Sequence, residues 1–598
     1  MRPLFLFTFL LCGCTAQTQP APSTPTPAPI APQHATLAIR DVRVFDGQKV
    51  MARATVLVDG DRIVAVGENI APPAGVEVVD GAGKTLLPGL IDAHVHVFDD
   101  ALEQALVFGV TTVLDMFSDA ETVKELRNAR PDRADLRSAV TLATAPGGHG
   151  TEYGLEIPTL TRPDEAQAFV DARIAEGSDY IKIIIDDGST IGRPLPTLSN
   201  DTLAALVKAA HARGKMAVVH VNSLEATKAV VAAGADGIEH IFADQMPPAG
   251  FAADAVKHKV FITPTLAVMS AVYGRKTPID TDESLAPYLT PANHKQLRAT
   301  FRLHGIGPAG AAAGMAAVKE LEAAGVPILA GTDAPNPGTT FGASMHDELA
   351  LLVSAGLTPS QALEAATSAP ARAFSLSDRG RIAAGLRADL LLVDGDPTSD
   401  ILATRHIAGV WHSGVRLDRD AARAKVSAAV AAAAAPIPTA PPGIVSDFDD
   451  GTLATRFGRP WVETSDKAFG GKSTVAINVE KGALQMRGQV TAGNAFGTWA
   501  GAMITPGGPH FEPIDLSKTK GLAFRARGNA KDYMVLLFTQ RHGRRPVQQG
   551  FTAGPKFTRV AIPWSSFEGT DGSDITGIVI CRTAPGAFEL AIDDVAFY

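Results

Sequence analysis

The chain has 598 residues, with 46% hydrophobic and 20% charged side chains, a composition typical of a soluble protein with several packed cores. Its formal net charge of −9 gives no reason to expect nucleic-acid binding. Only three cysteines occur, two of them within the first 14 residues, so neither an internal disulfide nor a thiolate zinc site is expected.

Residues 1–14 have the features of an export signal. A basic residue precedes the apolar run Leu4–Leu11, which is too short to cross a bilayer as a mature helix. The run ends in Leu11-Cys12-Gly13-Cys14, which resembles the bacterial lipobox. The resemblance implies lipidation of Cys14 and anchoring in the bacterial cell envelope, as an outer-membrane lipoprotein facing the periplasm or the surface. The alternative is an ordinary secretory peptide on a soluble periplasmic or secreted protein. Residues 15–35, rich in Pro and Thr, are expected to be a tether.

The segments 36–87 and 377–420 alternate apolar and polar residues in the manner of strands. Each segment is too short to form a stable domain alone. We therefore expect the two segments to build one small composite β-sandwich.

Residues 88–376 alternate short apolar runs with amphipathic stretches, which predicts an α/β fold, a (β/α)8 TIM barrel. Helical patterns end at glycines such as Gly214 and Gly234, the residue type favoured just after a helix. The barrel strands are expected at Gly89–Val97, Thr111–Met116, Ala139–Thr144, Tyr180–Ile185, Met216–Val221, Gly237–Ile241, Val260–Leu266 and Pro327–Gly331.

Side chains that can bind a metal lie on these strands or at their carboxyl ends, where barrel enzymes place their chemistry. The first strand ends in His94-Val95-His96, whose two rings point to one side of a strand. Lys182 lies in an otherwise aliphatic strand, where an unpaired ammonium is costly to bury. The alternative for this lysine is that it reaches the rim or pairs with Asp186 or Asp187. The set is completed by His220, His240 and Asp333, and together these residues predict a metal centre.

The order HxH, Lys, His, His, Asp on successive strands resembles the binuclear form of the amidohydrolase superfamily, in particular its imidazolonepropionase-like and prolidase-like members. The segments Thr358–Thr367 and Gly380–Leu390 are also similar to that family. The resemblance implies two divalent cations, the first bound by His94, His96 and Asp333 and the second by His220 and His240. It also implies that CO2 converts Lys182 to N6-carboxylysine, which bridges the two cations together with a water or hydroxide. Zinc suits this ligand set, and manganese, iron and cobalt stay open as alternatives.

These roles imply a hydrolase of small-molecule substrates, in which Asp333 takes the proton as hydroxide attacks and delivers it to the leaving group. The leading expectation is cleavage of amide or peptide bonds in dipeptides such as Xaa-Pro, or in N-acyl and aromatic-acyl amino acids. One alternative is a lactonase, cyclic-imide hydrolase or organophosphate hydrolase with the same centre. Another is a catalytically inactive, glycan-binding surface lipoprotein.

Three further residues are expected to contact the substrate. His149 lies in a glycine-rich loop after the third strand and resembles a residue with which prolidase-like relatives bind a substrate carboxylate. Asn222 follows His220 by two residues and His346 follows the last strand, so both are expected to line the pocket. Residues 267–310 form a long connection of the kind that can act as a lid.

An Ala- and Pro-rich linker is expected at 421–443, followed by an all-β region at 444–598. The start of this region, Asp447–Gly451, and its end, Leu590–Val595, resemble galactose-binding-like jelly rolls and, more closely, the complex I intermediate-associated protein family. The resemblance implies a jelly-roll sandwich that can contact carbohydrate and whose paired aspartates can hold a structural Ca2+ ion. The side chains of Trp461, Trp499 and Trp564 are expected in its core. Homo-oligomers are common in the amidohydrolase superfamily, but the sequence indicates no interface.

Overall fold

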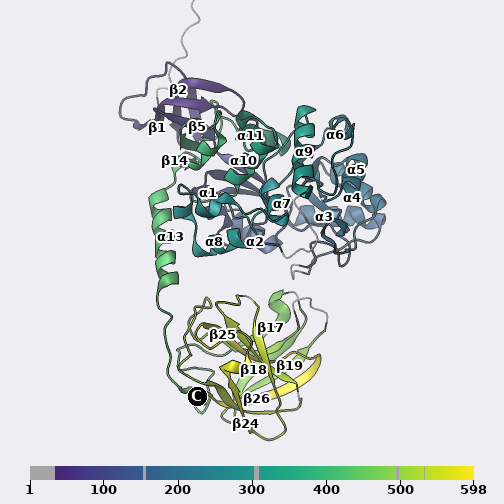
Figure 1. The fold of residues 1–598 in the computed structure, drawn as a ribbon, viewed down its shortest axis with the longest axis vertical. Coiled ribbons are helices and arrows are strands. Elements are labelled where there is room, and N and C mark those ends of the chain that lie inside the picture. Colours follow the sequence, from purple (N-terminus) through teal and green to yellow (C-terminus); the bar gives the residue numbers. More distant parts are fainter. Residues whose placement is uncertain are drawn as a thin grey trace, which may run out of the picture.

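The computed structural model describes residues 34–128, 130–152, 156–301, 309–469, 471–492, 497–530, 532–543 and 545–598. Cys14 therefore lies outside the described residues. Figure 1 shows an upper body of sheets and helices, the long helix α13 (Arg419–Ala434) at its side, and an all-β part below.

Both flanks of the middle segment contribute strands to one mixed sheet. The strand order is β15-β14-β13-β5-β1-β2-β3, and β4 pairs with β1. The antiparallel pair β5–β13 sets Lys84 opposite Asp394 and Pro88 opposite Leu390, so the sheet joins the start and the end of this part of the chain. The strands are β1 (Leu37–Phe45), β2 (Val50–Asp59), β3 (Arg62–Gly67), β4 (Glu77–Asp80), β5 (Lys84–Pro88), β13 (Leu390–Asp394), β14 (Ile407–His412) and β15 (Val415–Arg416).

The middle segment contains parallel strands with helices between them. β6, β7 and β8 form one sheet, and β9, β10, β11 and β12 form another. Isolated parallel bridges join β9 to Ala143, β12 to Ile328 and β6 to Ala334. This order agrees with the expected barrel, whose closure by eight regular strands stays a prediction. The strands are β6 (Leu90–Val95), β7 (Val110–Asp115), β8 (Asp135–Ser138), β9 (Ile181–Ile184), β10 (Ala217–His220), β11 (Gly237–Glu239) and β12 (Phe261–Thr263).

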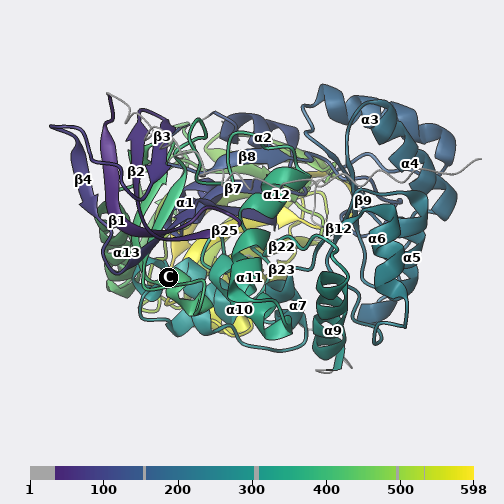
Figure 2. The same ribbon diagram turned by 90° about the horizontal axis from the view of Figure 1, so that it is seen from above.

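Helices α3, α4, α5 and α6 lie on the outer side of β9 and β12 (Figure 2). Helix α4 begins where the Ser199 side chain accepts a hydrogen bond from Thr202 N, and it buries Leu203 and Leu206 at helical spacing. The helices are α1 (Ala101–Val107), α2 (Ala120–Leu126), α3 (Ala166–Ala175), α4 (Asn200–Ala212), α5 (Leu224–Ala233), α6 (Phe251–His258), α7 (Leu266–Val272), α8 (Pro291–Arg298), α9 (Ala309–Ala323), α10 (Met345–Ala355), α11 (Pro359–Ala365), α12 (Ser368–Ala373) and α13 (Arg419–Ala434).

Two expected strands differ in the structure. The third lies upstream of 139–144, as β8, and the φ of 57° at Val140 interrupts the strand beyond it. Asp135 is accommodated at the start of β8 because Arg379 and Arg387 contact its carboxylate. The strand expected at 327–331 is represented by the isolated bridge at Ile328.

The C-terminal region consists of antiparallel strands in two sheets. One follows the order β18-β19-β26-β21-β24, with β16 on β26, and the other follows β17-β20-β25-β22-β23. Their common core includes Trp461, Phe524 and Trp564, whereas a jelly-roll order stays a prediction. The strands are β16 (Gly443–Ser446), β17 (Val462–Ser465), β18 (Thr474–Glu480), β19 (Ala483–Val490), β20 (Ala500–Ile504), β21 (Gly521–Gly528), β22 (Tyr533–Thr539), β23 (Val547–Phe551), β24 (Thr558–Pro563), β25 (Ile575–Arg582) and β26 (Gly586–Phe597).

The aspartates expected to hold calcium do not gather into a cation-binding group within the described residues. Both groups of ligand-type side chains found there belong to the middle segment. Arg525 Nη1 instead lies 3.3 Å from a carboxylate oxygen of Asp593 and of Asp594, so a guanidinium partly neutralises these two charges. A structural Ca2+ ion stays a prediction.

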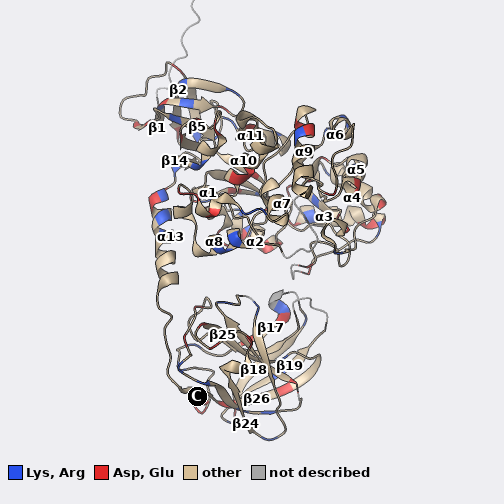
Figure 3. Ribbon diagram, viewed as in Figure 1, with Lys and Arg blue, Asp and Glu red and all other residues tan. Residues whose placement is uncertain are grey.

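Helix α13 connects the two parts of the molecule along the expected linker. In the structure it buries none of its residues, and its charged side chains lie in its first half (Figure 3). Across the described ranges, no helix is both long and apolar enough to cross a bilayer.

Candidate metal centre

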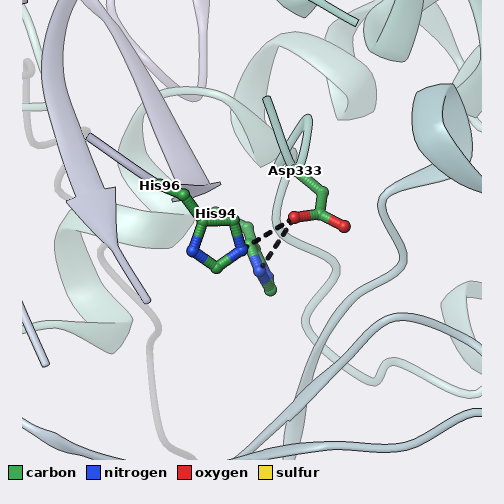
Figure 4. Close-up of side chains that lie close together, drawn as sticks. All are labelled: His94, His96 and Asp333. Carbon is green, nitrogen blue, oxygen red and sulfur yellow. Dashed lines mark ion pairs between the residues drawn. The ribbon is translucent and has the colours of Figure 1, made fainter. Parts of the chain in front are cut away.

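His94, His96 and Asp333 meet at the carboxyl ends of the parallel strands (Figure 4). Asp333 Oδ1 lies 3.5 Å from His94 Nε2 and 3.0 Å from His96 Nε2. Two ligand atoms about 2.0–2.1 Å from one tetrahedral cation stand about 3.4 Å apart. The three side chains therefore have the spacing of ligands to a single cation.

Asp92 holds together the two segments that carry this group. Its carboxylate accepts hydrogen bonds from His94 N, Thr332 N and Thr332 Oγ1, and Asp333 N donates to His94 O at 2.8 Å. Asp333 has a φ of 54°, a left-handed conformation that costs about 1–3 kcal/mol for such a residue. The buried hydrogen bonds of Asp92 thus hold Asp333 in a strained conformation beside the histidines.

Hydrogen bonds at Nδ1 orient the imidazole rings. His94 Nδ1 lies 2.5 Å from Glu239 Oε2, and His240 Nδ1 lies 2.7 Å from Thr265 Oγ1. His240 also has a left-handed φ, of 67°, directly after β11. A histidine held at Nδ1 keeps Nε2 available for a cation.

Lys182 reaches the same space from β9. Its side chain is buried, and among the described residues its Nζ has no hydrogen-bond partner. Burial lowers the pKa of Lys182 to about 8. The alternative of pairing with Asp186 or Asp187 is not found: Asp186 contacts His220, and Asp187 accepts hydrogen bonds from Ser189.

Burial also favours the neutral form of three histidines of this centre. It lowers the pKa of His94 and His240 well below the usual imidazole range, and that of His220 to about 4. In the described part of the chain, His94 Nε2, His220 Nε2 and Asp333 Oδ1 are buried without a hydrogen-bond partner. Such atoms are costly to bury, and neutral imidazole is the metal-binding form. The donor set therefore fits divalent cations.

A second group adjoins the first. One ligand atom each from His149, Asp186 and His220 lies within 4.8 Å of the other two. The ring centroid of His220 is 4.4 Å from that of His240, which is 4.7 Å from that of His94. The six residues predicted as ligands line one cavity.

This cavity has a volume of about 300 Å³. His149 and Asn222 line it, as expected, and Glu152 and Asp186 are further polar members of its wall. An apolar wall lies on helix α7 and just beyond its end: Val268, Met269, Val272 and Tyr273.

Two of the predicted substrate residues already make polar contacts in this wall. His149 Nδ1 lies 2.8 Å from Glu152 Oε1. Although burial opposes the charged form, this hydrogen bond and nearby carboxylates raise the pKa of His149 above the usual value. Asn222 donates a hydrogen bond from Nδ2 to Asp186 Oδ1.

The structure does not bring His346 to the cavity, in contrast to the sequence-based expectation. His346 is buried in α10, with Nε2 3.0 Å from Phe108 O and Nδ1 3.1 Å from Thr404 Oγ1. Both ring nitrogens therefore serve packing between α10, the segment after α1 and the segment before β14. The position of His346 after the last expected strand did not indicate that its ring is buried away from the cavity.

Sequence reasoning missed Glu239 and did not assign a role to Asp186. Glu239 is fully buried, and burial raises its pKa to about 8. An acidic residue within or directly after an aliphatic strand was the available signal, as in Ile238-Glu239-His240.

Comparisons with known proteins agree with this arrangement. The sequence profile described as "Amidohydrolase family" matches residues 85–417, and that of "Complex I intermediate-associated protein 30 (CIA30)" matches residues 447–592. An imidazolonepropionase from Streptomyces griseus is 27% identical over 414 residues, which cover 61% of this chain and 92% of that protein.

Solved structures extend the comparison to the fold. A Xaa-Pro dipeptidase with bound methionine has a TM-score of 0.52 and 22% identity, covering 64% of this chain and 99% of its own. Molinate hydrolase has a TM-score of 0.51 and 20% identity, covering 65% of this chain and 96% of its own. At these identities, the two structures support a common fold.

Proposed function

The chain belongs to the amidohydrolase family and is a hydrolase acting on carbon–nitrogen bonds of small substrates, and we propose that it cleaves amide or peptide bonds with a pair of divalent cations. Its substrates are dipeptides such as Xaa-Pro, or N-acyl and aromatic-acyl amino acids. The observation that carries this proposal is that His94 Nε2, His220 Nε2 and Asp333 Oδ1 are buried without a hydrogen-bond partner among the described residues.

The residues present would hold two cations. His94, His96 and Asp333 would hold the first and His220 and His240 would hold the second, and zinc suits both sets. Bound divalent cations lower the pKa of a water molecule and polarise a carbonyl group. The Asp333 carboxylate, at the wall of the cavity, takes a proton from the attacking water and returns it to the leaving nitrogen.

Lys182 is proposed to carry a carboxylate derived from CO2. The neutral amine forms a bond from Nζ to the carbon of CO2 and releases one proton, which leaves a carbamate anion. This modification supplies two oxygen ligands where an ammonium supplies none. The burial of Nζ without a hydrogen-bond partner among the described residues supports this proposal.

The cavity wall suggests how a substrate lies. We assign the carboxylate of an amino-acid product to His149, whose raised pKa favours the protonated ring. The apolar wall on α7, with Met269 and Val272, faces the substrate's apolar group. A cavity of about 300 Å³ suits a dipeptide-sized molecule rather than a folded protein.

The test is hydrolysis of a panel of dipeptides and N-acyl amino acids by the purified protein, supplied with zinc and bicarbonate, beside Asp333→Asn. Metal-dependent release of free amino acid that the variant lacks would support the proposal. Two bound cations without turnover of any member would redirect the proposal to lactones, cyclic imides or phosphoesters.

We also propose that the chain is an exported lipoprotein. The apolar run before Leu11-Cys12-Gly13-Cys14 supports this localisation. The expected result is incorporation of labelled fatty acid by the wild-type chain but not by Cys14→Ser. Equal labelling of both proteins would contradict it.

A further inference from the structure

The carboxylate of Asp186 lies at the same distance from the His220 ring as the carboxylate of Asp333 does from the His94 ring. The separation of Asp186 Oδ2 from His220 Nε2 is 3.5 Å, and that of Asp333 Oδ1 from His94 Nε2 is also 3.5 Å. Both values match the separation of about 3.4 Å expected between two ligands of one tetrahedral cation. Asp186 is 5% exposed, lies two residues after the end of β9, and lines the cavity.

The carboxylate of Asp186 is held so that one oxygen stays available. The hydrogen bonds from Gly188 N and Asn222 Nδ2 both end on Oδ1. Oδ2 is the oxygen that faces His220 Nε2, and among the described residues that nitrogen has no hydrogen-bond partner. At 3.5 Å, these two atoms have the separation of a weak polar contact and also that of two ligands of one cation.

We propose that Asp186 is a ligand of the second cation, beside His220 and in addition to the ligands implied by the family resemblance. The inference rests on the proposed function, because it requires a second cation. Each cation then has one direct carboxylate, Asp333 at the first and Asp186 at the second. Asn222 acts as a positioning residue, since its amide fixes the rotation of the Asp186 carboxylate.

The first experiment measures cation binding rather than activity. The purified full chain, stripped of metal, is titrated with Co2+, and bound metal is quantified for wild type, Asp186→Asn and the matched control Asp187→Asn. Asp187 is exposed, and among the described residues its carboxylate accepts hydrogen bonds only from Ser189. We expect two cations in wild type and in the control. In Asp186→Asn, the first binds unchanged and the second at least about 10-fold more weakly.

A second experiment reports direct ligation. Asp186→Cys loaded with Co2+ should show the near-ultraviolet thiolate-to-cobalt absorption, whereas wild type and Asp187→Cys should lack it. Cys12, Cys14 and Cys581 are present in all three proteins, so any band from these thiols would also appear in wild type. This measurement decides the question if Asp186→Asn proves unstable.

The outcomes separate this inference from the proposed function. Two cations bound with wild-type affinity by Asp186→Asn, together with no thiolate band in Asp186→Cys, would overturn the role of Asp186 alone. One cation in wild type would also overturn it and leave a mononuclear hydrolase. No bound cation in wild type would overturn both proposals.

Discussion

Buried charges at the two ends of the parallel strands have opposite surroundings. At the amino ends, Asp135 Oδ2 lies 2.6 Å from Arg379 Nη1, and Arg387 and His412 also contact this carboxylate. In the cavity toward the carboxyl ends, Lys182 Nζ, which comes from β9, has no hydrogen-bond partner among the described residues. Paired charges stabilise a fold and unpaired ones mark a site, so substitutions at the two ends should affect different quantities.

The largest effect is expected from Asp333→Asn. An amide cannot take the proton of the attacking water, so kcat should fall at least about 10³-fold, equivalent to about 4 kcal/mol. Steady-state kinetics with an amide substrate from the panel measure this. The melting temperature of the metal-free protein should stay near that of wild type, and a large decrease would mean that this end of the strands also stabilises the fold.

Asp135→Asn should have the reverse profile. Removing one partner from a buried ion-pair cluster costs about 3 kcal/mol, so the free energy of unfolding should fall by that amount while kcat of the folded enzyme is unchanged. Denaturant titration followed at 25 °C provides the measurement. If Asp135→Asn reduced kcat but left the free energy of unfolding unchanged, the two ends of the strands would not differ in the way proposed.

The same cluster predicts a dependence on pH. Burial opposes the charge of Asp135, but the hydrogen bond from His412 and the charges of Arg387 and Arg379 hold its pKa well below the usual range. A depressed pKa gives stability that is complete above about pH 4, the value of an unfolded aspartate, and that is lost as the pH falls toward the pKa of the folded state. The difference in stability between wild type and Asp135→Asn should therefore shrink below pH 4 in unfolding titrations.

Glu239→Gln should have a smaller effect, which is confined to the metal centre. Glutamine can still contact His94 Nδ1 but is a weaker hydrogen-bond acceptor than a carboxylate, so affinity for the first cation should fall about 10–100-fold. Competition with a chromophoric chelator measures the change. Glu225→Gln on helix α5, outside the cavity lining, is the control, and equal affinities in both variants would contradict an orienting role for Glu239.

The smallest effect is expected at the apolar wall. Met269→Ala should lower kcat/KM for substrates with a bulky apolar group about 10-fold relative to those with a small one, because the lost contact is worth about 1–3 kcal/mol. His346→Gln, whose residue lies outside the cavity lining, should leave KM unchanged. A changed KM in His346→Gln would support the sequence-based prediction that His346 contacts the substrate.

The sequence could predict which side chains share the cavity because strand ends are recognisable. His220 ends strand β10, His240 directly follows β11, and His94 lies near the end of β6. Parallel strands bring their carboxyl ends to one edge. The positions of residues beyond the strand ends were harder to predict. The orientation of His346 depends on packing between α10 and distant segments, and the start of β8 depends on arginines from the far end of the segment. Neither contact produces a recognisable pattern in the neighbouring sequence.

The pairing of β5 with β13 has a consequence for how the protein is made. Lys84 and Asp394 are partners across 310 positions of the chain, so a growing polypeptide presents β5 long before its neighbour exists. Closing so long a loop slows folding. Until β13 emerges, the apolar residues Leu86 and Leu87 stay uncovered along one edge. A nascent or truncated chain ending before residue 390 should therefore need a chaperone to stay in solution.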